Sequence, residues 1–192
     1  EKVCKFSNYL KKLKLKKGDR VAAYVPNKIE TVISFLACAK NGIIWSSCSP
    51  DFGVQGVVDR FKQIEPKVFI TSDYYFYNGK KINILDKVDE VLKQIPSIEK
   101  VIVYNYYKKE KENLKNFIDF EETLNVESDE TFERFEFNHP IYILFSSGTT
   151  GKPKCITHGT GNVLIEHNKE FMLHCDIRDN DKLFYYTTTG WM

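Results

Sequence analysis

The stretch 144–159, LFSSGTTGKPKCITHG, gathers hydroxyl groups, glycines and two lysines in one short run. Its hydroxyl donors are Ser146, Ser147, Thr149 and Thr150. Gly148 and Gly151 allow backbone angles that other residues avoid, and successive N–H groups in such a turn form an anion-binding nest. Pro153 favours an extended conformation at Lys152, which leaves Lys154 to direct its ammonium towards the anion. The run therefore predicts a site for a polyphosphate.

Three other readings of these motifs are weaker. A flexible linker would gain nothing from the apolar run 141–145 before it and the predicted helix after it. A Walker A loop needs glycine where Ser146 stands and Ser or Thr where Pro153 stands. The tripeptide DFG at 51–53 matches the kinase magnesium motif, but no kinase catalytic-loop motif accompanies it, so we read it as a turn.

Alternating elements must position this loop. Apolar runs predict strands at 20–25, 43–47, 67–71, 100–104, 141–145 and 183–187. Helical spacing predicts an N-terminal helix that turns Phe6, Leu10 and Leu13 inward and ends by Gly18, and further helices at 28–41, 54–64, 82–95 and 162–173. Asn27 and Glu30 fit a capping box, and the polar stretch 105–116 is expected to be a surface loop.

This alternation predicts an α/β architecture with a largely parallel sheet. The run 141–145 is apolar throughout, as is typical of a strand covered on both faces. In open parallel sheets, ligands bind beyond the carboxyl ends of the strands, and the glycine-rich loop follows such an end.

The composition of the chain limits the kinds of partner that it could bind. Among 192 residues, 28 Lys and Arg face 26 Asp and Glu, a net charge of +2 that gives no overall field for nucleic acid. The basic start, YLKKLKLKKGDR, reads as the solvated face of a helix, with a membrane-surface or calmodulin-target helix as the alternative. No apolar run has transmembrane length, and no signal peptide is recognisable.

The five cysteines and four histidines form no metal-ligand spacing, so we expect no metal site in this segment. Scattered cysteines in odd number suggest reduced thiols and a cytoplasmic or matrix location.

The segment ILFSSGTTGKPK resembles the phosphate loop of the adenylate-forming superfamily, which includes acyl-CoA synthetases, luciferases and peptide-synthetase adenylation domains. The upstream KKGDRVAAYVPN is similar to the start of that family's first subdomain. Two more stretches, SPDFGVQGVVDRFKQIEPKV (49–68) and FYYTTTGWM (184–192), resemble the acetoacetyl-CoA synthetase family rather than the acetyl-CoA synthetases. The resemblance spans residues 1–192.

The resemblance implies an ATP-dependent ligase of lipid and ketone-body metabolism. Acetoacetate would attack the α-phosphate of ATP with Mg²⁺ present, giving an acyl-adenylate and pyrophosphate, and coenzyme A would then displace AMP. It assigns the β- and γ-phosphates to the loop Ser146–Gly151 and Lys154. The loop would stabilise charge on the departing pyrophosphate.

It also assigns Trp191, with its neighbour Met192, to the acyl pocket; the alternative is an ordinary core aromatic. Lys80 or Lys81 would lie near the 3′-phosphate of coenzyme A, or else in a solvated turn. Cys155 stands where many family loops have glycine, and we assign it no role.

The chain opens on Glu1 and ends at Met192 without a helix stop, so we expect a fragment of the N-terminal adenylation domain, with the C-terminal domain absent. Because the catalytic residues are expected beyond Met192, we expect this stretch alone to be inactive. Alternatives are a synthetase for acetate or propionate and a non-catalytic nucleotide-binding protein. The sequence gives no oligomeric state.

Overall fold

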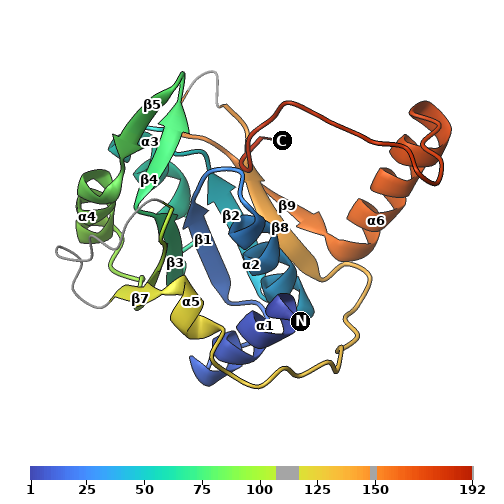
Figure 1. Cartoon of the computed structure of the whole chain (residues 1–192), viewed down its shortest axis with the longest axis horizontal. Helices are drawn as coiled ribbons and strands as arrows, with labels where there is room; N and C mark the ends of the chain where they lie inside the picture. The colour runs from blue at the N-terminus through green and yellow to red at the C-terminus, as the bar shows by residue number, and fades with distance from the viewer. Residues whose placement is uncertain (107–116, 148–150, 192) are drawn as a thin grey trace.

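The computed structural model describes residues 1–106, 117–147 and 151–191, and within them the molecule is centred on one seven-stranded sheet (Figure 1). In spatial order the strands are β7 (Phe117–Asp119), β6 (Lys100–Tyr104), β3 (Val68–Ser72), β1 (Arg20–Tyr24), β2 (Ile44–Cys48), β8 (Pro140–Phe145) and β9 (Cys155–Gly159). Neighbours pair in parallel from β7 through β8, and the edge strand β9 runs antiparallel to β8. The predicted α/β class with a largely parallel sheet is confirmed.

Strand β1 shows how the sheet divides the core. Ala22 and Tyr24 belong to one apolar cluster, whereas Val21 and Ala23 belong to the other, since successive strand side chains point to opposite faces. All four are fully buried. A strand covered on both faces is an unbroken apolar run, which is why this strand is recognisable in the sequence.

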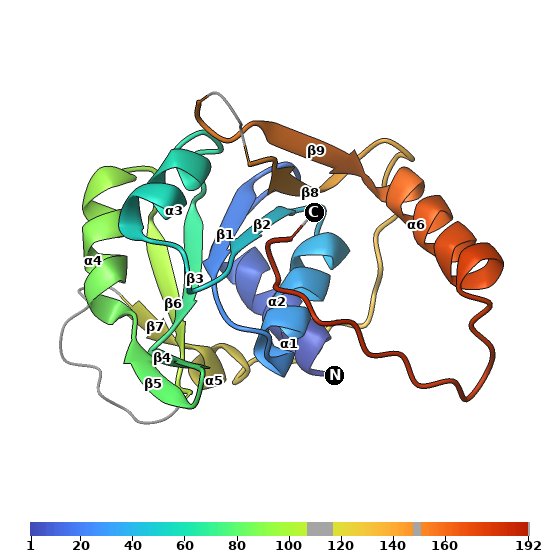
Figure 2. The same cartoon turned by 90° about the horizontal axis from the view of Figure 1, so that it is seen from above.

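Helices cover both faces of the sheet (Figure 2). One layer consists of α1 (Lys2–Lys12), α2 (Ile29–Lys40) and the short α5 (Phe120–Thr123), and the other of α3 (Val54–Phe61) and α4 (Leu85–Gln94). As predicted, α1 turns Phe6 and Leu10 inward, and each such side chain contributes about 1.5–3 kcal/mol when fully buried.

A separate hairpin replaces the start of the helix predicted at 82–95. Strands β4 (Tyr74–Tyr77) and β5 (Lys80–Asn83) pair antiparallel, and α4 begins at Leu85. Asn78 and Gly79, at the turn, have φ of +48° and +72°. Asn-Gly is the dipeptide that a two-residue hairpin turn favours, and this signal was missed.

The predicted capping box at the start of α2 is wrong. The helix begins after Lys28, and no side chain caps it. The Asn27 amide instead donates to the Thr187 carbonyl at 2.7 Å, and Glu30 forms an ion pair with Lys28 at 3.5 Å. A contact with the far end of the chain has replaced the local cap.

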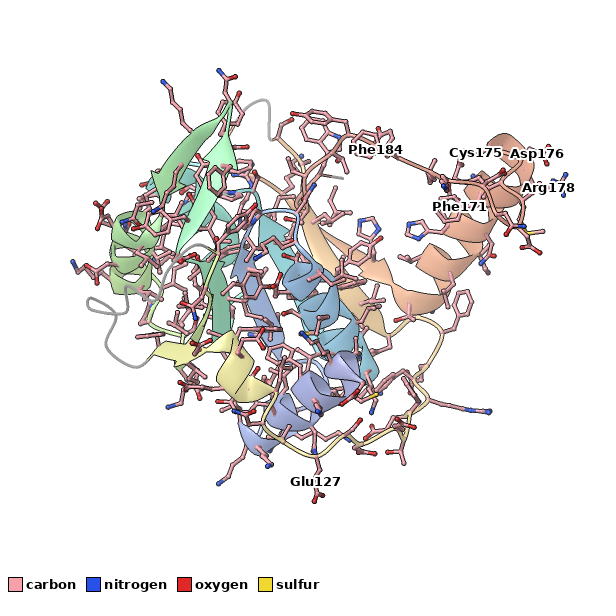
Figure 3. All side chains as sticks on the ribbon, viewed as in Figure 1. Glu127, Phe171, Cys175, Asp176, Arg178 and Phe184 are labelled. Carbon is pink, nitrogen blue, oxygen red and sulfur yellow. The ribbon has the colours of Figure 1, made fainter. Side chains whose placement is uncertain are left out.

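Residues 155–191, the C-terminal arm, are arranged differently. After β9 come α6 (Thr160–Lys169) and the π-helical turn η1 (Glu170–His174), neither of which buries a residue. In Figure 1, α6 stands apart from the helices that cover the sheet, and the chain then returns to the region where β2 ends. The strand predicted at 183–187 is wrong: these residues are in no strand, and Phe184, labelled in Figure 3, is 86% exposed.

Candidate functional site

A cavity of about 430 Å³ opens where β2 and β8 end. Its walls come from four segments: the end of β2, the turn and helix that follow, the end of β8, and the end of the arm. They are Ser47, Cys48, Phe52, Arg60, Phe145, Ser146, Ser147, Gly190 and Trp191. The cavity therefore lies at the carboxyl ends of two parallel strands, where the sequence placed the ligand.

The glycine-rich loop leaves the sheet at this cavity. Ser146 and Ser147 line the cavity. The Ser146 N–H donates to the Lys154 carbonyl at 3.1 Å, and this hydrogen bond joins the two ends of the loop. The register pairs Phe145 with Cys155, so a strand follows the loop and not, as expected, a helix. Gly148, Thr149 and Thr150 lie outside the described residues, and Gly151 and Lys154 are exposed.

Arg60 brings a positive charge to the cavity, and the sequence analysis missed it. Its guanidinium carbon lies 4.3 Å from the centre of the Phe52 ring, and Nη1 donates to the Gly56 carbonyl at 2.8 Å. A Cβ at Gly56 would approach Phe52 to 3.1 Å, so the glycine leaves room for this stack. The four-residue spacing of Gly56 and Arg60 was the available signal, because such residues share one side of a helix, and Phe52 lies just before that helix.

Cys48 faces the same cavity without being a nucleophile. Burial raises the pKa of its thiol to about 12, although the positive charge of Arg60 acts in the opposite direction. The thiol is therefore protonated at neutral pH, and only the thiolate is reactive.

The end of the arm is held beside β1 and β2 by hydroxyl groups that donate to backbone carbonyls. The Ser47 hydroxyl donates to the Thr189 carbonyl at 2.6 Å, and the Thr189 hydroxyl donates to the Val25 carbonyl at 3.3 Å. A Cβ at Gly190 would lie 2.6 Å from the Ser47 carbonyl oxygen, a separation that only glycine avoids. This contact places Trp191 at the mouth of the cavity.

Trp191 is 74% exposed, so it is not a core aromatic within the residues that the structure describes. It also borders a second cavity of about 690 Å³ between β9 and α6. There the His158 ring lies 4.8 Å from the Tyr142 ring, and burial lowers the pKa of His158. Met192 lies outside the described residues.

Lys80 and Lys81 do not line either cavity. Both are exposed on β5, where the Lys81 ammonium lies 3.8 Å from the centre of the Tyr74 ring. Figure 2 shows their hairpin well away from β8 and β9. They are solvated, as the alternative from the sequence held, but they lie on β5 directly after the turn rather than in it.

The described residues contain no helix long and apolar enough to cross a membrane. Nor do they contain a group of three or more His, Cys, Asp or Glu side chains that could hold a metal ion.

In parallel α/β domains, ligands bind beyond the carboxyl ends of the strands, which is where this chain has its hydroxyl- and glycine-rich loop and a cavity. The family described as "AMP-binding enzyme" matches residues 1–192, and the chain belongs to this family.

Individual relatives of this chain carry more specific names than the family does. The acetoacetyl-coenzyme A synthetase of Rhizobium meliloti is 49% identical over 91% of this chain and 27% of its own length. The acetoacetyl-CoA synthetase of Gallus gallus is 43% identical over 99% of this chain and 30% of its own length. The solved acetoacetyl-CoA synthetase of Streptomyces lividans has a TM-score of 0.93 and 39% identity, covering 99% of this chain and 29% of that one. The chain thus spans less than a third of the length of the relatives it matches.

Proposed function

We propose that the protein to which this chain belongs activates acetoacetate with ATP and transfers the acyl group to coenzyme A. The observation that carries the proposal is one cavity bordered by both Ser146–Ser147 and Gly190–Trp191, in a member of the AMP-binding enzyme family whose relatives are named acetoacetyl-CoA synthetases.

The reaction has two steps. A carboxylate oxygen of acetoacetate attacks the α-phosphorus of ATP, a P–O bond forms, and pyrophosphate leaves. The sulfur of coenzyme A then attacks the acyl carbonyl, the thiol proton goes to solvent or a base, and AMP leaves. Both leaving groups are anions, so donors fixed where charge develops lower the barrier.

The loop and its surroundings provide such donors. Ser146, Ser147 and the family-assigned Gly148–Gly151 would hold the β- and γ-phosphates, and Lys154 would add a positive charge. Arg60 faces the same cavity from α3, with its guanidinium over the Phe52 ring. We assign it to the neutralisation of the negative charge that gathers there during the reaction.

Trp191 and Met192 would form a wall of the acyl pocket, and Lys80 or Lys81 would meet the 3′-phosphate of coenzyme A. Mg²⁺ would accompany ATP, and we assign it no ligand among the described residues. The five cysteines are free thiols, in keeping with the cytoplasmic location that we propose.

The test is pyrophosphate exchange into ATP by the full-length protein, measured with acetoacetate, acetate and propionate at matched concentrations. We expect exchange with acetoacetate to exceed exchange with either other acid. Preference for acetate or propionate would make the protein a different short-chain synthetase. Absence of exchange with every acid, in a protein that still binds ATP, would leave a non-catalytic nucleotide-binding protein.

A further inference from the structure

Gln63 lies just beyond the end of α3 and contacts the returning side of the glycine-rich loop. Its Nε2 donates to the Pro153 carbonyl at 2.8 Å and to the Asp59 carbonyl at 2.6 Å. The Cys155 thiol lies 3.7 Å from Gln63 Oε1 and donates to it. Only the NH₂ group of an amide can donate to two carbonyls. These partners therefore also fix which end of the Gln63 amide is the nitrogen and which is the oxygen.

These contacts bear on Lys154 through the two peptide planes beside it. The Pro153 carbonyl belongs to the planar peptide unit that contains the Lys154 nitrogen, and Gln63 holds this carbonyl. The Lys154 carbonyl belongs to the next unit, and the Ser146 N–H holds that one. Fixing both planes fixes the two backbone dihedral angles of Lys154, and with them the direction in which its side chain leaves the chain.

We propose that Gln63 is a positioning residue for the phosphate loop: by anchoring the Pro153 carbonyl to α3, it aims Lys154 at the bound phosphates. The inference rests on the proposed function for its effect on ATP. Gln63 itself touches the loop and not the substrate, so its removal acts on ATP through Lys154 and leaves the acyl pocket, bordered by Trp191, unchanged.

The chain offers a matched control at the other end of α3. Gln55 is also exposed, and its Nε2 donates to the Asp59 carboxylate at 2.7 Å without any contact to the loop. Gln63→Leu and Gln55→Leu therefore remove the same groups near the two ends of α3. Gln63→Glu keeps the acceptor for the Cys155 thiol but puts a carboxylate oxygen against the Pro153 carbonyl, where no hydrogen bond can form.

Two measurements on the full-length protein test the proposal. In pyrophosphate exchange, we expect Gln63→Leu and Gln63→Glu to raise KM for ATP by about three- to tenfold, the effect of one lost hydrogen bond, with KM for acetoacetate unchanged. In hydrogen exchange by mass spectrometry, the peptide containing the Ser146 amide should exchange about three- to tenfold faster in both variants. Gln55→Leu should match the wild type in both measurements.

Equal rises in the two KM values, or Gln63 variants that behave like Gln55→Leu, would overturn the proposal. Hydrogen exchange needs no substrate. A wild-type protein without pyrophosphate exchange would therefore refute the proposed function, while the Ser146 amide would still decide whether Gln63 holds the loop.

Discussion

Strands β1, β2 and β3 bury every one of their large apolar side chains, whereas the C-terminal arm leaves Leu173, Phe184 and Tyr186 more than 70% exposed. The strands lie between two layers of helices, and the helices of the arm have no such cover among the described residues. Yet the candidate site takes one wall from each region. We therefore expect different residues to determine stability and ligand contact. Substitutions in the strands and their helices should affect folding, and substitutions around the loop should affect activity.

The largest expected effect is in the packed region. Phe61 is fully buried and its ring lies 6.0 Å from that of Phe69 and 6.5 Å from that of Phe145. We expect Phe61→Ala to lower the free energy of unfolding by about 3–5 kcal/mol, through lost burial and the cavity left behind. Phe184→Ala, in the arm, should stay within about 0.5 kcal/mol. Urea denaturation measures both, and equal losses would erase the distinction between the regions.

The next effect concerns the two lysines of the loop. Lys154→Ala in the full-length protein should lower kcat/KM by about 10- to 100-fold, as expected for one charge-assisted hydrogen bond, with the free energy of unfolding unchanged. Lys152→Ala should change kcat/KM much less, because Pro153 separates the orientations of the two residues. Equal losses for the two variants would contradict the assignment of Lys154.

Arg60 should give a smaller loss. Since it lines the cavity beside Ser146 and Ser147, we expect Arg60→Gln to lower kcat/KM by about three- to tenfold. Arg60→Lys should recover part of the loss, since the charge remains but the guanidinium over Phe52 is lost. If Arg60→Gln lowered the free energy of unfolding but left kcat/KM unchanged, Arg60 would be only a packing residue.

The smallest effect is a pH dependence. Partial burial acts to raise the pKa of Asp19, but hydrogen bonds from Lys67, at 2.8 Å, and from the Lys16 N–H outweigh it and lower the pKa below its usual 3.8. A lowered pKa in the folded state stabilises the protein above the usual value, and this contribution is lost as the pH falls through the folded-state value. Asp19→Asn should therefore cost up to about 1 kcal/mol at pH 7 and progressively less below pH 4.

Glu170 provides the comparison in the arm. Its hydrogen bonds from His174 and Lys169 lower its pKa to about 2, yet the ion pairs are exposed on a helix end that buries no residue. We expect Glu170→Gln to leave the midpoint of global unfolding unchanged from pH 3 to pH 7. A pH-dependent shift as large as that of Asp19→Asn would mean that the arm unfolds together with the sheet.

Apolar runs predicted strands correctly where both faces of the strand are buried, because burial on both faces requires apolar residues throughout the strand. The apolar runs of β1, β2, β3 and β6 each marked a strand, and the loop between 146 and 154 stood out by its composition. The same kind of apolar run wrongly predicted a strand at 183–187. This segment has no neighbouring strand among the described residues with which it pairs. Gln63 was missed for a different reason: its contact with the loop joins residues 90 positions apart in the chain, a proximity that no local pattern encodes. The spacing of Gly56 and Arg60 placed Arg60 on one side of α3 but did not indicate that this side faces the cavity.

The way in which the end of the arm is attached has a consequence for protein engineering. Asn27 and Ser47 grip main-chain oxygens of Thr187 and Thr189, so the path of the segment is insensitive to most of the side chains that it carries. Thr189 and Gly190 are exceptions: the Thr189 hydroxyl donates to the Val25 carbonyl, and any carbon added at Gly190 would collide with the Ser47 carbonyl. A saturation library at position 191 would thus vary the rim of the cavity on a backbone that stays in place, and it would show whether this rim sets the choice of acid in the proposed reaction.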